Sequence, residues 1–416
     1  MNTTHRQFSL RSPKLFSYLF FIGILSNMVL PSFLLGINWH PALFFSAFIS
    51  IFLLFECSYK GDFQCSSWVI FSVFLAFLVI ASDFYGKVVL GVKGGNSALY
   101  NVIFLIITFL PYIAILSKMQ VEVSFKVFIR TVNIFFILFL IISLLQALGP
   151  QSVSELLIKL YSHEPHTSVA LSGSRYTLTG PDPNVGSTIA AFFIVFYFVF
   201  SVQRRKLKYF LLLFASLIPL FLAQGRTVMI GLAICFMLYF WFFSGLRLRY
   251  KFFIFIVVIL IVLIGVSFVQ VDYLIRGISE LSKGESGSVN VRLQKALIVL
   301  DTFMDSPIIG QGANLEKYGR VTHIDSEYLL LLQRHGLIGF TFVVGVILIL
   351  MSKAIFFIRS SLSSHMLFIL CGVALFVMLT NVFIFNIDTF GIFVLMLYLF
   401  VTSKNSFLRY TNVTQH

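Results

Sequence analysis

Three arginines in polar stretches of the chain could together bind phosphate. Arg175 lies in SGSRYTLTGPDPNVG, Arg226 in AQGRTVMIG and Arg292 in SVNVRLQKA. A guanidinium group holds phosphoryl oxygens in a bidentate fork, so this set predicts a cradle for a phosphate-bearing substrate. The alternative is that each arginine contacts lipid phosphates or loop carboxylates. Arg226 is the strongest candidate, because almost no loop surrounds it and it must sit against the membrane surface or in a cavity.

His323, Asp325 and Glu327 form a second group, within THIDSEYLLLL. Either an imidazole or a carboxylate could act there as a general base on a hydroxyl, so both His323 and Asp325 are candidates. The alternative is a helix N-terminus, in which Asp325 or Ser326 is the N-cap and Glu327 complements the helix dipole. That alternative explains one of the acids, but it does not explain three such groups beside a Gly-rich turn.

Motifs for metals and nucleotides are weak in this chain. His163, Glu164 and His166 have ligand chemistry, but Pro165 interrupts them and no HExxH motif accompanies them. There is also no GxGxxG, Walker loop or serine nucleophile motif. The sequence therefore predicts neither a metal site nor a cofactor.

The composition indicates what must position these residues. Of 416 residues 59% are hydrophobic and 11% are charged, which predicts an all-α, polytopic membrane protein in one domain, residues 1–416. A helix needs about 20 apolar residues to cross the hydrocarbon. Twelve runs are expected to span it, some of them short: 15–35, 41–55, 68–81, 98–116, 127–148, 185–202, 210–223, 227–243, 252–270, 326–351, 366–385 and 390–401.

The net charge of +14 is explained by membrane topology. Most of the 30 Lys and Arg residues fall in loops on one side, together with few acids, and cytoplasmic loops retain such an excess. Both termini are therefore expected in the cytoplasm. Anionic lipid headgroups are the expected contact of the basic side, and a nucleic-acid partner is not implied.

Two long loops are predicted on the outer side, residues 149–184 and 272–325. Each is expected to contain an amphipathic helix at the bilayer interface. In the first, Ser152 and Glu155 have the spacing of a capping box. In the second, apolar residues recur at helical spacing and Asp305-Ser-Pro307 ends the helix; these residues are Leu293, Leu297, Leu300 and Met304.

The order of five features resembles the O-antigen polymerase and ligase superfamily of bacterial envelope glycosyltransferases. These features are Arg175 to Asn184 before a span, Gly225 to Thr227 at a tight turn, the Arg292 helix, the Ser306 to Gly312 turn, and His323 to Gly339. Ligases of this superfamily usually carry His followed by Asn at the start of the last motif. Here Asp325-Ser326 takes that register, with His323 two residues earlier, and this departure favours a polymerase.

The resemblance implies metal-independent glycosyl transfer between undecaprenyl-diphosphate-linked glycans at the periplasmic face of the inner membrane. Arg175, Arg226 and Arg292 would neutralise the leaving diphosphate, and His323 or Asp325 would take the acceptor proton. Tyr176 and Glu327 would contact glycan.

Repeat-unit polymerisation is the leading hypothesis, and transfer of glycan to lipid A core by a ligase is the runner-up. A polysaccharide flippase is a weaker alternative, because the predicted spans carry few polar groups. A chain-length regulator and a flippase are possible partners.

Overall fold

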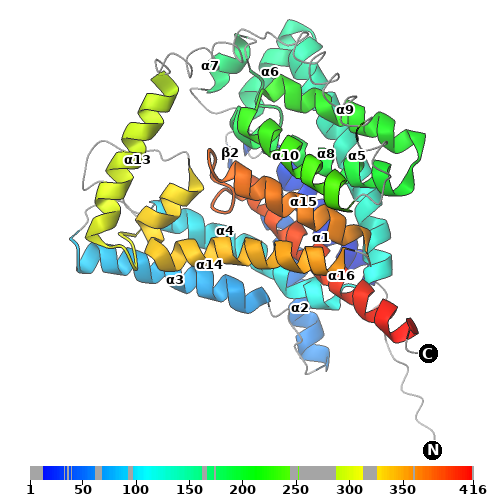
Figure 1. The fold of residues 1–416 in the computed structure, drawn as a ribbon, viewed down its shortest axis with the longest axis horizontal. Helices are drawn as coiled ribbons and strands as arrows, with labels where there is room; N and C mark the ends of the chain where they lie inside the picture. The colour runs from blue at the N-terminus through cyan, green and yellow to red at the C-terminus, as the bar shows by residue number, and fades with distance from the viewer. Residues whose placement is uncertain are drawn as a thin grey trace, which may run out of the picture.

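The apolar runs fold into helices that pack side by side, as the computed structural model shows (Figure 1). The structure describes residues 13–31, 33–34, 37–38, 40–60, 68–91, 97–161, 166–172, 175–243, 252, 287–312, 326–358 and 361–414. The predicted helical class is confirmed. The described residues add one small antiparallel strand pair, in which Phe33 pairs with Asn38 and Leu34 with Ile37.

The elements follow one another along the chain with short connections. They are α1 (Pro13–Val29), β1 (Phe33–Leu34), β2 (Ile37–Asn38), α2 (Pro41–Lys60), α3 (Trp68–Val88), α4 (Ser97–Ala114), a 3-10 turn (Ile115–Lys118), α5 (Val121–Leu148), α6 (Gln151–Tyr161), α7 (His166–Leu171), α8 (Pro183–Arg204), α9 (Leu207–Ala223), α10 (Arg226–Phe243), α13 (Gly287–Asp305), α14 (Glu327–Phe357), α15 (Leu362–Val377) and α16 (Ile387–Thr414).

Six of the described helices are long and apolar enough to cross a membrane, namely α3, α5, α8, α10, α14 and the first part of α16. Shorter apolar helices accompany them in α1, α2, α4, α9 and α15. These findings support a helical membrane protein. The count of twelve spans stays a prediction, and its ninth run, 252–270, lies outside the described residues apart from residue 252.

Helix α8 lies at the centre of the bundle. Within its most apolar stretch 94% of the residues are buried inside the protein, and the side chains from Val185 to Ser201 are all buried. A helix that is apolar on every side fits a position surrounded by other helices. Helices α9, α10, α15 and α16 pack around it, and the central position of α8 fixes where its N-terminus is presented.

Helix α3 continues beyond the predicted end of its apolar run at residue 81. It reaches Val88, and the extension includes Asp83 and Lys87. Lys87 Nζ lies 2.6 Å from Asp83 Oδ2, one helical turn away. Pairing at this spacing lets two charged residues remain within a helix, which hydropathy alone does not anticipate.

One end of the bundle collects the segments that precede and follow the candidate residues, and we call it the loop end. Hydrogen bonds join distant parts of the chain there. Thr179 Oγ1 donates to the Met28 carbonyl at the end of α1 (2.8 Å), and Asn27 Nδ2 donates to the Ile387 carbonyl at the start of α16 (3.0 Å). Gln146, near the end of α5, bonds both backbone groups of Leu178.

Helix α6 begins differently from the sequence expectation, and the capping-box interpretation of Ser152 and Glu155 is wrong. The helix starts at Gln151, whose Nε2 donates to Glu155 Oε1 (2.9 Å). The Pro150 carbonyl accepts from the backbone nitrogen of Val153 and so closes the first turn. Proline, which has a fixed φ and no N–H, takes the position before the helix.

Tyr161 ties the far end of α6 to α1. Its hydroxyl donates to the Val29 carbonyl (2.9 Å). Burial raises the pKa of the Tyr161 phenol above its ordinary value, so this group stays a neutral donor. The first long loop is therefore anchored to the bundle at the loop end.

Candidate functional site

Arg175 is held against the end of α9. Its Nε donates to the Ala223 carbonyl (3.2 Å) and its second terminal nitrogen donates to Asn184 Oδ1 (3.2 Å). The neighbouring Tyr176 donates its backbone N–H to the Leu222 carbonyl (3.1 Å). Both side chains are half-buried. Arg175 thus links the segment before α8 to the junction that follows α9.

The start of α8 is built so that this segment can approach it closely. Asp182 is the N-cap, and its carboxylate accepts from the backbone nitrogens of Asn184 (2.7 Å) and Val185 (3.0 Å). A Cβ at Gly186 would lie 2.2 Å from the Thr177 carbonyl oxygen. Glycine is therefore required at 186, and Asn184 is fixed where Arg175 reaches it.

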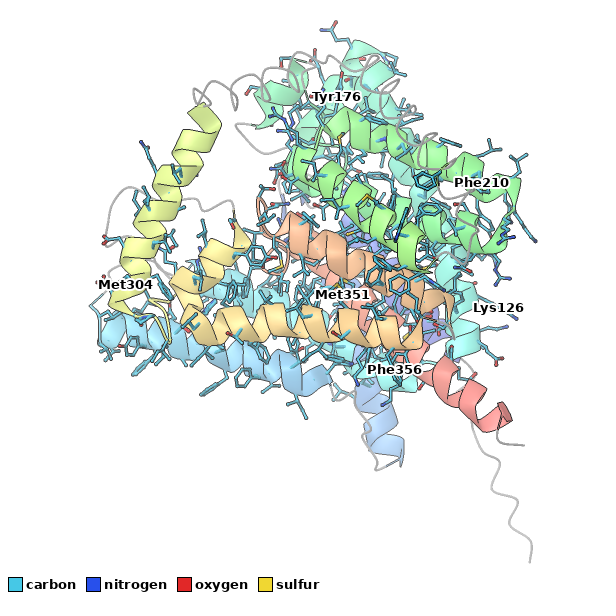
Figure 2. All side chains as sticks on the ribbon, in the orientation of Figure 1. Lys126, Tyr176, Phe210, Met304, Met351 and Phe356 are labelled. Carbon is cyan, nitrogen blue, oxygen red and sulfur yellow. The ribbon has the colours of Figure 1, made fainter. Side chains whose placement is uncertain are left out.

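Arg226 is the first residue of α10 and follows Ala223 by three positions. The chain reverses through Gln224, which has a positive φ of 53°, and Gly225. A Cβ at Gly225 would lie 2.2 Å from Ser187 Oγ, so the junction packs directly on α8. The structure therefore brings Arg175 and Arg226 to the same α9–α10 junction, near Tyr176, which Figure 2 labels in the upper part of the molecule.

Helix α14 is interrupted near its start. Gly336 has non-helical backbone angles (φ 61°, ψ −162°) and separates a short segment, Glu327–His335, from a long one, Leu337–Phe357. An interruption of this kind leaves carbonyls and N–H groups without their helical partners. Figure 1 shows the short segment turning away from the long one.

The Ser306–Gly312 turn supplies those partners. Four backbone hydrogen bonds join the turn to the two sides of the break: Gln311 N to Gln333 O (2.8 Å), Gly312 N to Arg334 O (2.9 Å), Leu337 N to Pro307 O (2.8 Å) and Ile338 N to Ile308 O (3.2 Å). The Gly-x-Gly turn and the Gly-Leu-x-Gly motif are therefore two halves of one backbone interaction.

Three glycines make this docking possible, and all have a positive φ: Gly310 (81°), Gly312 (83°) and Gly336 (61°). A Cβ at Gly310 would lie 2.5 Å from the Arg334 carbonyl oxygen, and one at Gly312 would lie 2.6 Å from Asp83 Cα in α3. The turn is thus packed between α14 and α3 without room for any side chain at these positions.

Glu327, predicted to contact glycan, is fully buried at the start of α14. Its Oε2 accepts from the backbone nitrogens of Phe383 (2.9 Å) and Ile384 (3.1 Å), and its Oε1 accepts from Ile384 (2.8 Å) and Phe385 (3.1 Å). Three successive N–H groups therefore surround one carboxylate, so Glu327 fixes the connection between α15 and α16.

Arg292 lies in the second turn of α13, which begins five residues before it, at Gly287; the structure does not describe its side chain. Helix α13 crosses the ends of the spans and packs on α14 (Figure 1). Val299 meets Leu330 in a small apolar cluster, and Gln333 Nε2 donates to Thr302 Oγ1 (3.1 Å). The predicted apolar stripe of α13 points away from this contact and is exposed; for example, Met304 is 74% exposed.

His323 and Asp325, the two candidates for the general base, lie outside the described residues. Both ends of the segment that carries them are nevertheless fixed. Gly312 is docked on α3 and α14, and Ser326 Oγ donates to the Met378 carbonyl (3.2 Å). Ser326 occupies the N-cap position, but its hydroxyl makes no capping hydrogen bond. His163 and Glu164 also lie outside the described residues.

Sequence reasoning missed the break in α14 and the buried polar residues Gln333, Arg334 and His335 that precede it. Gly336 was the available signal, because an isolated glycine in a helical pattern marks a backbone requirement. The docking partner could not be read locally, since it lies more than twenty residues earlier in the chain.

Comparison with known proteins bears on this same region. Residues 211–344 match the family model described as O-antigen ligase. The matched segment contains Arg226, Arg292, the Ser306–Gly312 turn and the break in α14, whereas Arg175 precedes it. No curated protein matches the chain. The family match supports the O-antigen polymerase and ligase superfamily, and the resemblance drawn from the sequence is confirmed.

Proposed function

We propose that the chain is a repeat-unit polymerase for a surface polysaccharide, acting on undecaprenyl-diphosphate-linked glycans at the periplasmic face of the inner membrane. The observation that carries the proposal is the pairing of Arg175 and Arg226 at the α9–α10 junction, joined through Ala223. Two guanidinium groups at one membrane-proximal turn suit a diphosphate. The family match supports an O-antigen polymerase or ligase type of function.

The reaction joins the reducing end of the growing glycan to a hydroxyl of the incoming repeat unit. A bond forms between the acceptor oxygen and the anomeric carbon, while the bond from that carbon to the phosphate oxygen breaks. The lipid diphosphate leaves with the electron pair, and its charge grows in the transition state. The acceptor proton passes to His323 or Asp325.

Each candidate residue has a distinct role in this proposal. Arg175, Arg226 and Arg292 stabilise the leaving diphosphate, and Tyr176 stacks on a sugar face. Glu327 contributes through the α15–α16 connection that its carboxylate holds. It is therefore a positioning residue in the proposal, because a fully buried carboxylate already engaged by backbone N–H groups is poorly placed to contact glycan.

Ligation to lipid A core is the second candidate, because the matching family is described as O-antigen ligase. Gel analysis of lipopolysaccharide from a deletion strain separates the two. A polymerase mutant attaches a single repeat unit to core, so its ladder collapses to one band. A ligase mutant lacks attached glycan and keeps polymer on the lipid carrier. Repeat units retained at the cytoplasmic face would contradict both functions and indicate a flippase.

The cradle is tested by Arg226→Ala and Arg292→Ala in the complemented deletion strain. We expect each variant to insert normally and to abolish polymerisation, because each removes a cation from the leaving group. Arg130→Ala is the matched control, since Arg130 is exposed on α5 and away from the loop end. Normal chain length in both test variants would refute the cradle.

A further inference from the structure

Three consecutive residues at the break in α14 carry buried polar atoms with no hydrogen-bond partner in the described part of the chain. They are Gln333 Oε1, Arg334 Nε and His335 Nδ1. Gln333 and His335 are 3% and 1% exposed, whereas Arg334 is half-buried. A run of three unsatisfied polar side chains is unusual, because buried polar groups in folded proteins nearly all have partners.

The Arg334 side chain has no carboxylate partner within the described residues, and the acids around it are already engaged. Glu327 accepts from the N–H groups of the α15–α16 connection. Asp83 pairs with Lys87, and Asp305 accepts from Gln311 Nε2 at 3.4 Å. A guanidinium removed from water without a counter-ion is costly, and an anion that supplies acceptors offsets that cost.

The break places Arg334 at the end of a membrane-length helix. The segment Leu337–Phe357 is about 31 Å long at 1.5 Å per residue, close to the thickness of the hydrocarbon. Arg334 precedes this segment, so it lies at the level of lipid phosphates. Its backbone carbonyl is fixed by Gly312, which holds the residue at that level.

This position is separate from the Arg175 and Arg226 pair. Helix α15 packs on both α10 and α14 and lies between them. Figure 2 shows the separation: Tyr176, next to Arg175, is in the upper part of the molecule, and Met304, at the α14 end of α13, is at the lower left. The loop end therefore carries two arginine positions on opposite sides of α15.

We propose that Arg334 binds the diphosphate of the second lipid-linked substrate, the acceptor, while Arg175 and Arg226 bind that of the donor. This inference rests on the proposed function, in which both substrates carry a diphosphate and only the donor loses it. The acceptor diphosphate stays intact, so it needs a binding residue rather than transition-state stabilisation. Gln333 Oε1 and His335 Nδ1 offer further polar contacts beside the guanidinium.

Binding stoichiometry tests the proposal independently of polymerisation. The full-length protein in phosphatidylcholine nanodiscs is titrated with radiolabelled farnesyl diphosphate, a short polyprenyl diphosphate. We expect two equivalents for the wild type and for Arg130→Gln. Arg334→Gln and Arg226→Gln should each bind one, with affinity for the lost equivalent reduced roughly tenfold or more. Arg334→Lys should keep the second equivalent at weaker affinity, because it keeps the charge without the fork.

Three results would overturn the assignment. One is two full-affinity equivalents in Arg334→Gln. Another is loss of both equivalents in Arg334→Gln and Arg334→Lys, which would mean that Arg334 maintains the fold. The third is displacement of the Arg334-dependent equivalent by phosphatidylglycerol nanodiscs, which would identify the anion as a lipid headgroup. If binding behaves as expected but the deletion strain keeps its ladder, the proposed polymerase function fails and the two-site assignment stands as lipid-diphosphate binding.

Discussion

Replacing Gly336 by alanine should detach the Ser306–Gly312 turn from α14. The new Cβ would lie 2.3 Å from the Ile308 carbonyl oxygen, 2.4 Å from its carbon and 2.7 Å from Gly310 N, all of them backbone atoms. The angles at Gly336, φ 61° and ψ −162°, lie in a region that is essentially restricted to glycine.

The cost can be estimated from these two effects. Holding a non-glycine residue in that region costs about 1–3 kcal/mol. Displacing the turn also breaks the bonds from Leu337 N to Pro307 O and from Ile338 N to Ile308 O, each contributing roughly 1 kcal/mol. We therefore expect Gly336→Ala to destabilise the protein by about 3–5 kcal/mol.

Gly345→Ala is the matched control, because the same change in the same helix meets nothing within 4 Å. It should be neutral or slightly stabilising, since alanine favours a helix over glycine by about 1 kcal/mol. Thermal unfolding in detergent compares the two variants, and the midpoint of Gly336→Ala should fall by about 5 °C or more. Equal midpoints for the two would refute the docking of the turn on the break.

Two further changes test how the loop end is held together. Glu327→Gln leaves one acceptor oxygen for three backbone N–H groups, so we expect a loss of about 2–4 kcal/mol and faster proteolysis of the 378–386 connection; unchanged proteolysis would count against the role of Glu327. Gly225→Ala should impair folding through its contact with Ser187, and Ser187→Gly in the same chain should restore expression, because it removes both close atoms; failure of the double variant to recover would exclude that contact as the cause.

Hydropathy predicted the helical membrane class, because each span reports its own burial through its own composition. Sequence also predicted that Asp305-Ser-Pro307 ends the helix before the turn, which the end of α13 at Asp305 confirms. It failed to predict that α3 would reach Val88, since the pair of Asp83 and Lys87 reads as polar loop until the helix aligns them.

The candidate site was predictable in part. The tight turn at Gly225 and Arg226 was visible as a break between two apolar runs, and the structure adds that Arg175 reaches the same junction. The partner of Gly336 was not visible, because hydrogen bonds between a turn and a distant helix leave no local pattern. The choice between His323 and Asp325 stays a prediction.

The break in α14 also couples the loop to bilayer thickness. The segment Leu337–Phe357 adjusts to hydrophobic mismatch by tilting or by moving along the membrane normal. The Ser306–Gly312 turn must follow, because four backbone hydrogen bonds fasten it to the end of that segment. Arg175 and Arg226 belong to other helices with their own lengths. A change in lipid acyl length would therefore alter the relative height of the two arginine positions, which makes membrane thickness a variable in how the two substrates are aligned.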